Sequence, residues 1–437
     1  VDSVWEEFNR RYQLAEEECV PKKIVQVGKK NEKKFLDREG KSKRKKKYRL
    51  WKKYLATKDE KTYSEYCKSR NQVRRMTRKA VKNHEKEIAK KCKSNSKLFW
   101  QYVHSKTKIR SSVPDLHLPG EEKCDRIKTD SDKAELLGQY FSEVFVNEPE
   151  WNWDLGQFCA HKSDDLELLI TEEKVEEKLQ EMNVNKSPGP DRMHSRVLKE
   201  IAPVIIRALT IIFNTSLRVG KIPNTWKIAA VTPVYKNKGS KHHPSNYRPI
   251  SLTCIASRLM ESIIRDTILD YMKKKNLLSD LQYGFVGGRS TTLQLLSVLD
   301  KWTDALDRGN AVDVIFCDFQ KAFDTVPHKR LLEVLEYYGI GNPILAWIQD
   351  FLKDRKMQVF VNGSFSSEFN VLSGVPQGSV LGPLLFIIFI NLLIEKTNSD
   401  NLFLYADDVK VFQEIQTNDD IEYLQHLLDK MYDWTCY

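Results

Sequence analysis

Two groups of aspartates lie where strands are predicted to end. Residues 311–318, AVDVIFCD, are typical of a largely buried strand that ends on Asp318. Residues 401–412 predict two short apolar strands with Asp407 and Asp408 at the turn between them. If these strands are neighbours, the three carboxylates converge. Phosphoryl transfer to a 3′-hydroxyl needs such a site, because two divalent ions about 4 Å apart activate the attacking oxygen and stabilise the leaving pyrophosphate.

The metal hypothesis depends on the motifs that accompany these aspartates, because an Asp-Asp pair alone is usually ordinary turn chemistry. Their carboxylate oxygens are hard ligands, which favour Mg²⁺, with Mn²⁺ as the second candidate. Six sequence blocks occur in order along the chain. They are NKSPGPD (185–191), NYRPISL (246–252), QYGF with GRST (282–285 and 288–291), DFQKAFD (318–324), SGVPQGSVLGP (373–383) and YADD (405–408).

With these blocks the chain resembles the reverse transcriptases of non-LTR, LINE-like retrotransposons, particularly the jockey-like group. The resemblance extends from Lys97 to the C-terminus. It implies RNA-directed DNA polymerase activity, in which dNTPs are added to the 3′-end of a DNA primer or target on an RNA template. By position, it implies that Asp318, Asp407 and Asp408 are the catalytic metal ligands.

The resemblance also implies a nucleotide-binding site. Phe323 corresponds to the family's aromatic that would clash with a ribose 2′-hydroxyl, although without the motif an ordinary core aromatic would be the simpler interpretation. Gln377 and Gly378 correspond to a loop that borders the nucleotide and the template, where glycine lets the backbone approach the substrate. Alone, this loop would be read as a Pro-Gly turn before a helix.

Basic residues near the predicted strand 229–235 complete this site. The resemblance implies that Lys236 and Arg248 hold the triphosphate, whose developing charge needs ammonium and guanidinium groups. Arg289 is expected either to contact a template or primer phosphate or to form a structural ion pair, and the sequence favours neither.

The basic charge of the chain is concentrated in one segment. The formal net charge is +11, yet residues 21–110 alone contain 33 Lys and Arg against 8 Asp and Glu. A pair of solvated helices is the simpler interpretation, and the run 41–49 could be a nuclear localisation signal. Because aromatic residues recur in the segment, we favour RNA binding by backbone neutralisation and base stacking. The candidate contact residues are Lys45, Lys46, Arg74 and Arg75.

Cysteines and apolar runs indicate the cellular environment. The eight cysteines are scattered and form no CxxC pair, which disfavours a zinc site or a disulfide framework. The longest uninterrupted apolar run, 384–390, is far shorter than the roughly 20 residues of a membrane span. We therefore expect an intracellular protein of the nucleus and cytoplasm, with no membrane partner.

The alternation of short strands and helices after residue 228 predicts an α/β or α+β enzyme domain. The resemblance narrows this to an α+β right-hand polymerase fold, with an antiparallel palm sheet backed by helices. The expected parts are a basic helical extension and connector (1–165), fingers (166–310) and a truncated catalytic palm (311–437). The family continues beyond this point, so the thumb is expected to be absent.

Two other functions remain open. The chain could be a truncated or domesticated remnant that binds nucleic acid without polymerising. It could also be an RNA-templated RNA polymerase or an intron maturase, which share the arrangement of aspartates. Preference for dNTPs over NTPs would exclude the RNA polymerase, and the splicing-linked domain of a maturase is not expected here.

Overall fold

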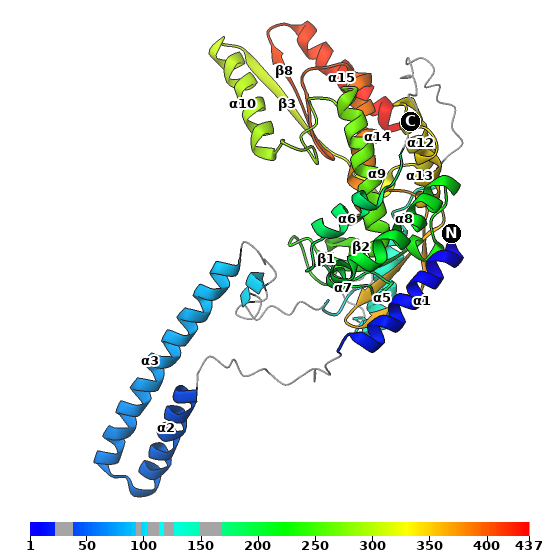
Figure 1. Ribbon diagram of the computed structural model, residues 1–437. Helices are drawn as coiled ribbons and strands as arrows, with labels where there is room; N and C mark the ends of the chain where they lie inside the picture. The colour runs from blue at the N-terminus through cyan, green and yellow to red at the C-terminus, as the bar shows by residue number, and fades with distance from the viewer. Residues whose placement is uncertain are drawn as a thin grey trace. The chain divides into compact units, whose positions relative to one another are not determined.

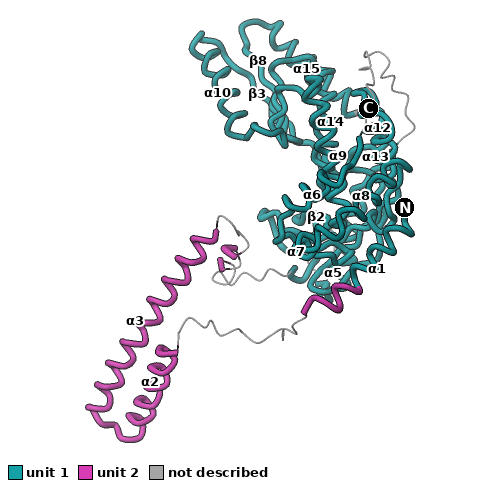
Figure 2. The backbone as a smooth tube through the Cα atoms, in the orientation of Figure 1, with its two compact units in different colours: residues 1–13, 112–437 teal, residues 14–111 magenta. Residues whose placement is uncertain are grey.

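The computed structural model describes residues 1–21, 38–92, 98–100, 102–103, 113–117, 126–148, 166 and 168–436. The chain forms two units, one of residues 1–13 and 112–437 and the other of residues 14–111 (Figure 2). Residues 1–13 and 112–165 of the predicted N-terminal part fall in the larger unit. The predicted boundaries at residues 165 and 310 stay predictions.

The smaller unit contains a helical hairpin. Helix α2 (Arg38–Thr57) is followed by α3 (Glu60–Lys91), and the two helices pack against each other. Asp59 caps α3, because its carboxylate accepts hydrogen bonds from the backbone N–H groups of Lys61 (3.3 Å) and Thr62 (2.9 Å). The expected pair of helices is therefore present in this segment.

Four aromatic rings join the two helices of this hairpin. The ring centroids of Trp51 and Tyr66 are 4.8 Å apart, and those of Tyr54 and Tyr63 are also 4.8 Å apart. Rings at these distances stabilise each other. These four rings therefore contribute to packing of the two helices, while Tyr63 and Tyr48 are also exposed, and base stacking by the segment stays a prediction.

The two ends of the predicted extension pack into the larger unit. In α1 (Asp2–Cys19), Trp5 is buried, and its indole Nε1–H donates to the hydroxyl of Thr225 at 2.8 Å. In α5 (Asp130–Ser142), Leu137 is buried in an apolar cluster that includes residues of the mixed sheet described below. Each such side chain contributes about 1.5–3 kcal/mol of burial free energy.

Four helices pack against one another, and residues 195–219, for which the sequence predicts one helix, form two of them. The structure has α6 (Glu172–Glu181), α7 (Ser195–Glu200), α8 (Ala202–Val219) and α9 (Ile255–Lys274). The expectation of one helix was wrong because Pro203 has no N–H for a helical hydrogen bond and instead occupies the first turn of α8. Among the described residues, α8 alone is long and apolar enough to cross a membrane, and its Leu209 and Phe213 are buried in the main core.

The first sheet is mixed. Its strands are β1 (Ile228–Tyr235), β2 (Tyr247–Leu252), β4 (Arg355–Val361), β5 (Ser364–Phe365) and β6 (Phe369–Val371). The strand order is β2-β1-β4-β5, with β6 also paired to β4; β1 is antiparallel to β2 and parallel to β4. The Asn362-Gly363 pair after an apolar strand predicts a type I′ turn, and both residues have the positive φ that this turn requires, 51° and 108°. Short 3-10 turns precede β1 and β2 at Asn224–Lys227 and Pro244–Asn246.

The second sheet is antiparallel and has the order β3-β8-β7. Its strands are β3 (Ala311–Asp318), β7 (Leu402–Tyr405) and β8 (Asp408–Ile415). The predicted strand 311–318 is confirmed, but the expectation that it is largely buried is wrong. As an edge strand, β3 alternates between exposed and half-buried residues, and the Phe316 side chain is 67% exposed.

Helices lie on both faces of the second sheet: α10 (Thr291–Asp307) contacts β3 and β7, and α15 (Asn418–Cys436) contacts β8. Helix α14 (Gly382–Thr397) packs against α15 and against α12 (His328–Tyr337), and α12 packs against α13 (Ile344–Leu352). The short helix α11 (Ala322–Thr325) follows β3. Helix α10 lies along β3 and β8 (Figure 1), where Val298 packs with Phe403 and Phe412. Val409 and Val411 point to the other face and join the main core with residues of α14 and α15. The predicted α+β class is confirmed.

Candidate active site

Three aspartates lie at one end of the antiparallel sheet. Asp318 is the last residue of β3 and is paired in the strand register with Asp408, the first residue of β8. Asp408 is also paired with Tyr405, the last residue of β7. Ala406 and Asp407 therefore form a two-residue turn at the same end of the sheet. The two predicted groups of aspartates meet because β3 and β8 are neighbours.

The charges of the three aspartates interact. Asp407 is half-buried, and burial is the main cause that raises its pKa above the ordinary value; the charges of Asp408 and Asp318 raise it further, while Arg248 opposes the shift. Among the described residues, no three Asp, Glu, His or Cys side chains gather closely enough to form a metal site by themselves. Mg²⁺ commonly takes only one or two protein carboxylates and completes its shell with water and substrate phosphates. The aspartates fit a metal site in which protein carboxylates, water and substrate phosphates together coordinate the ion.

A cavity of about 1060 Å³ opens beside these carboxylates. It is lined by both predicted metal-binding groups and by all the predicted nucleotide-binding residues. The predicted residues in its wall are Asp318, Asp407, Lys236, Arg248, Phe323, Gln377 and Gly378. Asp408 instead lines an adjoining cavity of about 360 Å³, whose wall also includes Asp318. Asp318 thus borders both cavities.

The β1–β2 hairpin supplies positive charge to the large cavity. Arg248 is exposed on β2, and Lys236 follows β1 directly, where its ammonium group donates to the backbone oxygen of Ser245 at 2.8 Å. Lys238 and Lys321 also line the cavity. Burial lowers the pKa of Lys321, and the nearby charge of Lys236 contributes to this shift. The cavity wall therefore contains cations as well as carboxylates, as binding of a phosphate chain beside metal ions requires.

Phe323 is held in the cavity wall by other rings. It is half-buried in α11, and its ring stacks on Phe386 of α14 with centroids 4.3 Å apart and planes at 18°. The Phe285 ring approaches edge-on at 6.1 Å. Contacts of this kind contribute about 0.5–1.5 kcal/mol each beyond burial. The Phe323 ring therefore has a fixed position at the edge of the cavity.

The loop that contains Gln377 and Gly378 lies against β2. The backbone N–H of Ser251 donates to the carbonyl of Gln377 at 2.8 Å. Gly378 has φ +112°, and a Cβ atom there would overlap the Ser251 carbonyl oxygen. This position therefore requires glycine on both conformational and steric grounds.

Comparison with known proteins agrees with this geometry. Residues 235–436 match the family model described as reverse transcriptase (RNA-dependent DNA polymerase). Over these residues the chain is similar to the reverse transcriptases of LINE-like retrotransposons. A domain of this family is that of an enzyme, a nucleotidyltransferase, and the family generally uses divalent metal ions.

Proteins similar to this chain occur among Drosophila melanogaster transposons. The chain is 35% identical over 226 residues to the probable RNA-directed DNA polymerase from transposon BS, which covers 50% of this chain and 24% of the relative. It is 31% identical over 242 residues to that from the X-element (54% and 26%). It is 28% identical over 291 residues to the RNA-directed DNA polymerase from mobile element jockey (62% and 32%). The matched regions are about a quarter to a third of each relative's length.

The other predicted contact residues lie outside the cavity wall. The Arg289 guanidinium donates to the backbone oxygens of Gln282 (2.9 Å) and Ser279 (3.3 Å) and forms an ion pair with Asp280. Of its two predicted roles, the structural ion pair is therefore present, and contact with nucleic acid stays a prediction. Four further candidates are exposed on α2 and α3 of the smaller unit. These are Lys45, Lys46, Arg74 and Arg75.

Several cavity residues were missed by the sequence analysis. Tyr140 and Phe141 of α5 line the cavity although they precede the aspartates by more than 170 positions, and no local motif marks them. Asp324 lies within a motif that was recognised, but it received no role. Its position at the end of the DFQKAFD block was the available signal.

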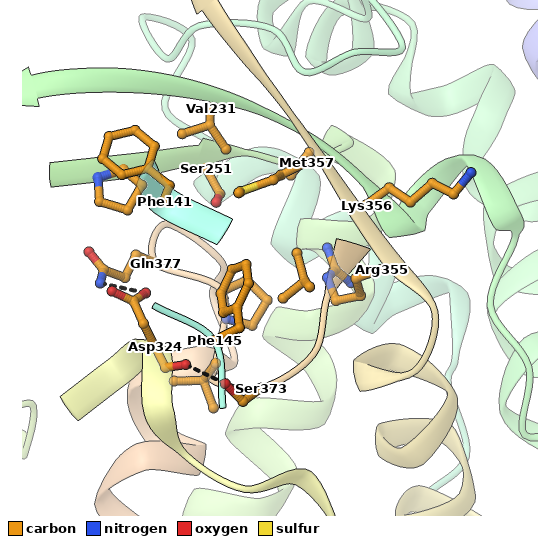
Figure 3. Close-up of a pocket in the computed structure, with 15 residues that line it drawn as sticks. Phe141, Phe145, Val231, Ser251, Asp324, Arg355, Lys356, Met357, Ser373 and Gln377 are labelled. Atoms are coloured by element: carbon orange, nitrogen blue, oxygen red, sulfur yellow. Dashed lines mark hydrogen bonds between the residues drawn. The ribbon is translucent and has the colours of Figure 1, made fainter. Parts of the chain in front are cut away.

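Asp324 connects the nucleotide-site loop to α11. The Gln377 side-chain amide donates to its carboxylate at 3.0 Å, and the Ser373 hydroxyl donates to its backbone oxygen at 2.7 Å. Figure 3 shows Asp324 and Gln377 facing each other on one side of a small cavity of about 40 Å³, with Arg355 and Lys356 on the opposite side. Burial raises the pKa of Asp324 from 3.8 to about 6. The residue thus combines a fixed contact with a charge that is costly to bury.

We expect Asp324→Asn to stabilise the protein much more at pH 8 than at pH 4. The raised pKa means that the folded chain favours the protonated carboxyl, so this residue's contribution to stability falls as pH rises from about 4 to 6. Asparagine keeps an oxygen for Gln377 and removes the buried charge, which should gain up to about 3 kcal/mol above pH 6. Thermal unfolding at both pH values measures this difference. An equal gain at pH 4 and pH 8 would contradict the charge explanation.

Proposed function

We propose that the protein adds dNTPs to the 3′-end of a DNA primer or target, copying an RNA template. The observation that carries this proposal is the single cavity that holds Asp318, Asp407 and the basic residues of the β1–β2 hairpin. The assignment of the β3-β8-β7 sheet as palm and the mixed sheet with its helices as fingers belongs to the same proposal. The names of the transposon relatives support it.

The chain's own residues have distinct roles in this proposal. Asp318 and Asp407, with Asp408 beside them, would hold two Mg²⁺ ions, which supply activation of the 3′-hydroxyl and stabilisation of the pyrophosphate charge. Lys236 and Arg248 neutralise the triphosphate from the opposite wall of the cavity.

The uncharged residues of the site select and orient the nucleotide. Gln377 donates or accepts hydrogen bonds at the sugar or base, and Gly378 lets the loop backbone approach them. The Phe323 ring leaves room for a deoxyribose and overlaps a 2′-hydroxyl. Exclusion of NTPs therefore depends on sterics, whereas binding of the triphosphate depends on charge.

Primer extension on poly(rA)/oligo(dT) tests the proposal. The wild-type protein is expected to incorporate dTTP with Mg²⁺, and UTP much less efficiently. Efficient UTP incorporation would favour the RNA polymerase alternative. If no nucleotide is incorporated with Mg²⁺ or Mn²⁺ although the protein binds RNA, the remnant that only binds nucleic acid is the better account.

We further propose that the α2–α3 hairpin binds nucleic acid through phosphate contacts. Replacing Lys45, Lys46, Arg74 and Arg75 together with Gln is expected to weaken RNA binding and to reduce the slope of log affinity against log salt by about 3. Each basic residue that contacts a phosphate releases about one counterion. Fluorescence anisotropy with a labelled RNA at several salt concentrations measures the slope.

A matched control separates these contacts from general charge. Gln substitutions at Arg207, Arg218, Lys273 and Lys274 remove the same number of exposed charges from α8 and α9. This variant is expected to retain the wild-type salt slope. Equal losses in both variants would indicate that binding follows net charge and is not localised in the hairpin.

We also propose that the protein acts inside the cell, in the nucleus and cytoplasm. The support is the exposed basic run 41–49 on α2, which has the composition of a nuclear localisation signal. A fluorescent fusion should lose nuclear accumulation when this run is neutralised. Unchanged accumulation would contradict the proposal.

A further inference from the structure

The turn that carries Asp407 has a backbone conformation that its sequence does not favour. Ala406, the first residue of the turn, has φ +56°. Two-residue hairpins with positive φ at this position usually have glycine there, because an alanine Cβ crowds the backbone. Such a conformation persists when surrounding contacts hold it. The contacts that hold Ala406 therefore determine where Asp407 lies.

The most direct contact to Ala406 comes from Gln282. This side chain is buried, with 1% of its surface exposed, and its Oε1 accepts hydrogen bonds from the N–H groups of Ala406 (2.9 Å) and Gly284 (2.7 Å). Two accepted bonds identify this atom as the oxygen of the amide. Its Nε2 makes no hydrogen bond among the described residues. The oxygen is thus the functional end of the side chain here.

The segment around Gln282 is itself fixed against the sheet. The N–H of Tyr283 donates to the Leu404 carbonyl at 2.8 Å, and the N–H of Leu404 donates to the Leu281 carbonyl at 2.9 Å. These bonds add residues 281–283 to β7 as a short parallel bridge. Gly284 then passes so close to the turn that a Cβ atom would overlap the Ala406 nitrogen.

The other end of this segment is anchored from α14 and from Arg289. The Asn391 side-chain oxygen accepts from the Ser279 N–H at 2.9 Å. Arg289 donates to the carbonyl of Gln282, as described above. Gln282 is therefore held at its backbone while its side chain reaches the turn.

We propose that Gln282 is a positioning residue that sets the location of the Asp407 carboxylate for metal binding. The inference rests on the proposed function, because it takes Asp407 to be a ligand of the catalytic metal ions. It predicts that loss of the Gln282 oxygen weakens metal binding before it affects nucleotide binding. Gln282 itself touches neither substrate nor metal in this assignment.

Titration with Mn²⁺, followed by its paramagnetic resonance signal, tests the proposal without requiring activity. Gln282→Met keeps the length of the side chain and removes the acceptor, and it is expected to weaken Mn²⁺ binding about tenfold. Gln282→Glu retains an oxygen in either protonation state and should stay within about threefold of wild type. In primer extension, Gln282→Met should raise the Mg²⁺ requirement and lower kcat, with KM for dTTP changed less than about twofold.

A matched control distinguishes positioning from stability. The side-chain amide of Asn214 on α8 also forms hydrogen bonds with the backbone. It accepts from the N–H of Ile170 at 3.2 Å and donates to the carbonyl oxygen of Ile170 at 2.7 Å. Asn214→Leu should lower the Tm and leave Mn²⁺ affinity unchanged. A folded Gln282→Met protein with wild-type Mn²⁺ affinity would overturn the proposal. Wild-type protein without primer extension, but with the expected Mn²⁺ differences, would overturn only the proposed function.

Two further measurements cover the case in which Gln282→Met does not fold. Gly284→Ala leaves Gln282 in place and forces the turn away from the same contact, so it should also weaken Mn²⁺ binding; unchanged binding would overturn the proposal. Amide hydrogen exchange of wild-type residues 402–408 should show a slowly exchanging Ala406 N–H. Rapid exchange at Ala406 would show that Gln282 does not hold the turn.

Discussion

Asp407→Asn is expected to lower primer extension by at least about 10³-fold, which corresponds to about 4 kcal/mol of lost transition-state stabilisation. Asparagine preserves the size of the side chain but removes the charge that a divalent ion requires at the turn between β7 and β8. The dissociation constant of labelled template–primer should change little, because the substituted carboxylate is proposed to bind metal and not nucleic acid. The kcat for dTTP addition at saturating substrate measures the effect.

The same substitution, Asp407→Asn, should raise the stability of the metal-free protein although it lowers activity. The pKa of Asp407 is raised by burial and by the charges of Asp408 and Asp318, so the ionised form is disfavoured in the folded chain. Its removal is expected to raise the Tm slightly in metal-free buffer near pH 8. Mg²⁺ should then stabilise the wild-type protein, because ligands that bind only the native state raise its stability, and should stabilise Asp407→Asn much less.

An exposed aspartate on the same sheet provides the control. Asp313 lies on β3 away from the cavity, and Asp313→Asn makes the same chemical change. It should retain extension and the response of Tm to Mg²⁺. Equal extension by wild-type protein and Asp407→Asn would eliminate the polymerase proposal and leave nucleic-acid binding as the supported function.

The sequence predicted the strands of the site well because their ends coincide with chemical signals. Asp318 ends an apolar run, and Asn362-Gly363 has the side chains that a type I′ turn needs. That β3 and β8 are adjacent in the sheet, by contrast, depends on the pairing of strands some 90 residues apart, which no local sequence pattern predicts. This adjacency was expected only from the resemblance to a known family.

The errors arose where tertiary contacts decide a residue's environment. Apolar composition suggested that β3 is buried, but its place at the sheet edge leaves Phe316 exposed. Aromatic recurrence gave no sign that Trp51 and Tyr66 also pack between two helices. Gln282 carries no charge and received no role, because its importance comes from a single contact to a turn 124 residues away.

Phe323→Ala is expected to reduce the preference for dTTP over UTP by about 10- to 100-fold, measured as the ratio of the two kcat/KM values. The ring lines the cavity between the carboxylates and the Gln377 loop, and its stack on Phe386 prevents it from moving away from a 2′-hydroxyl. Steric discrimination of a single small group is worth about 1–3 kcal/mol, which sets this range. The reduced preference should result mainly from faster UTP incorporation by Phe323→Ala.

A second variant tests whether the fixed position of the ring matters. Phe386→Leu keeps Phe323 but removes its stacking partner, so the ring gains freedom and the preference should fall by a smaller factor. If Phe323→Ala incorporates dTTP normally and retains the wild-type preference, the ring is an ordinary packing residue of α11. If both variants lose the preference equally, the stack, and not the bulk of Phe323 alone, determines sugar selection, because a mobile ring can yield to a hydroxyl that a held ring excludes.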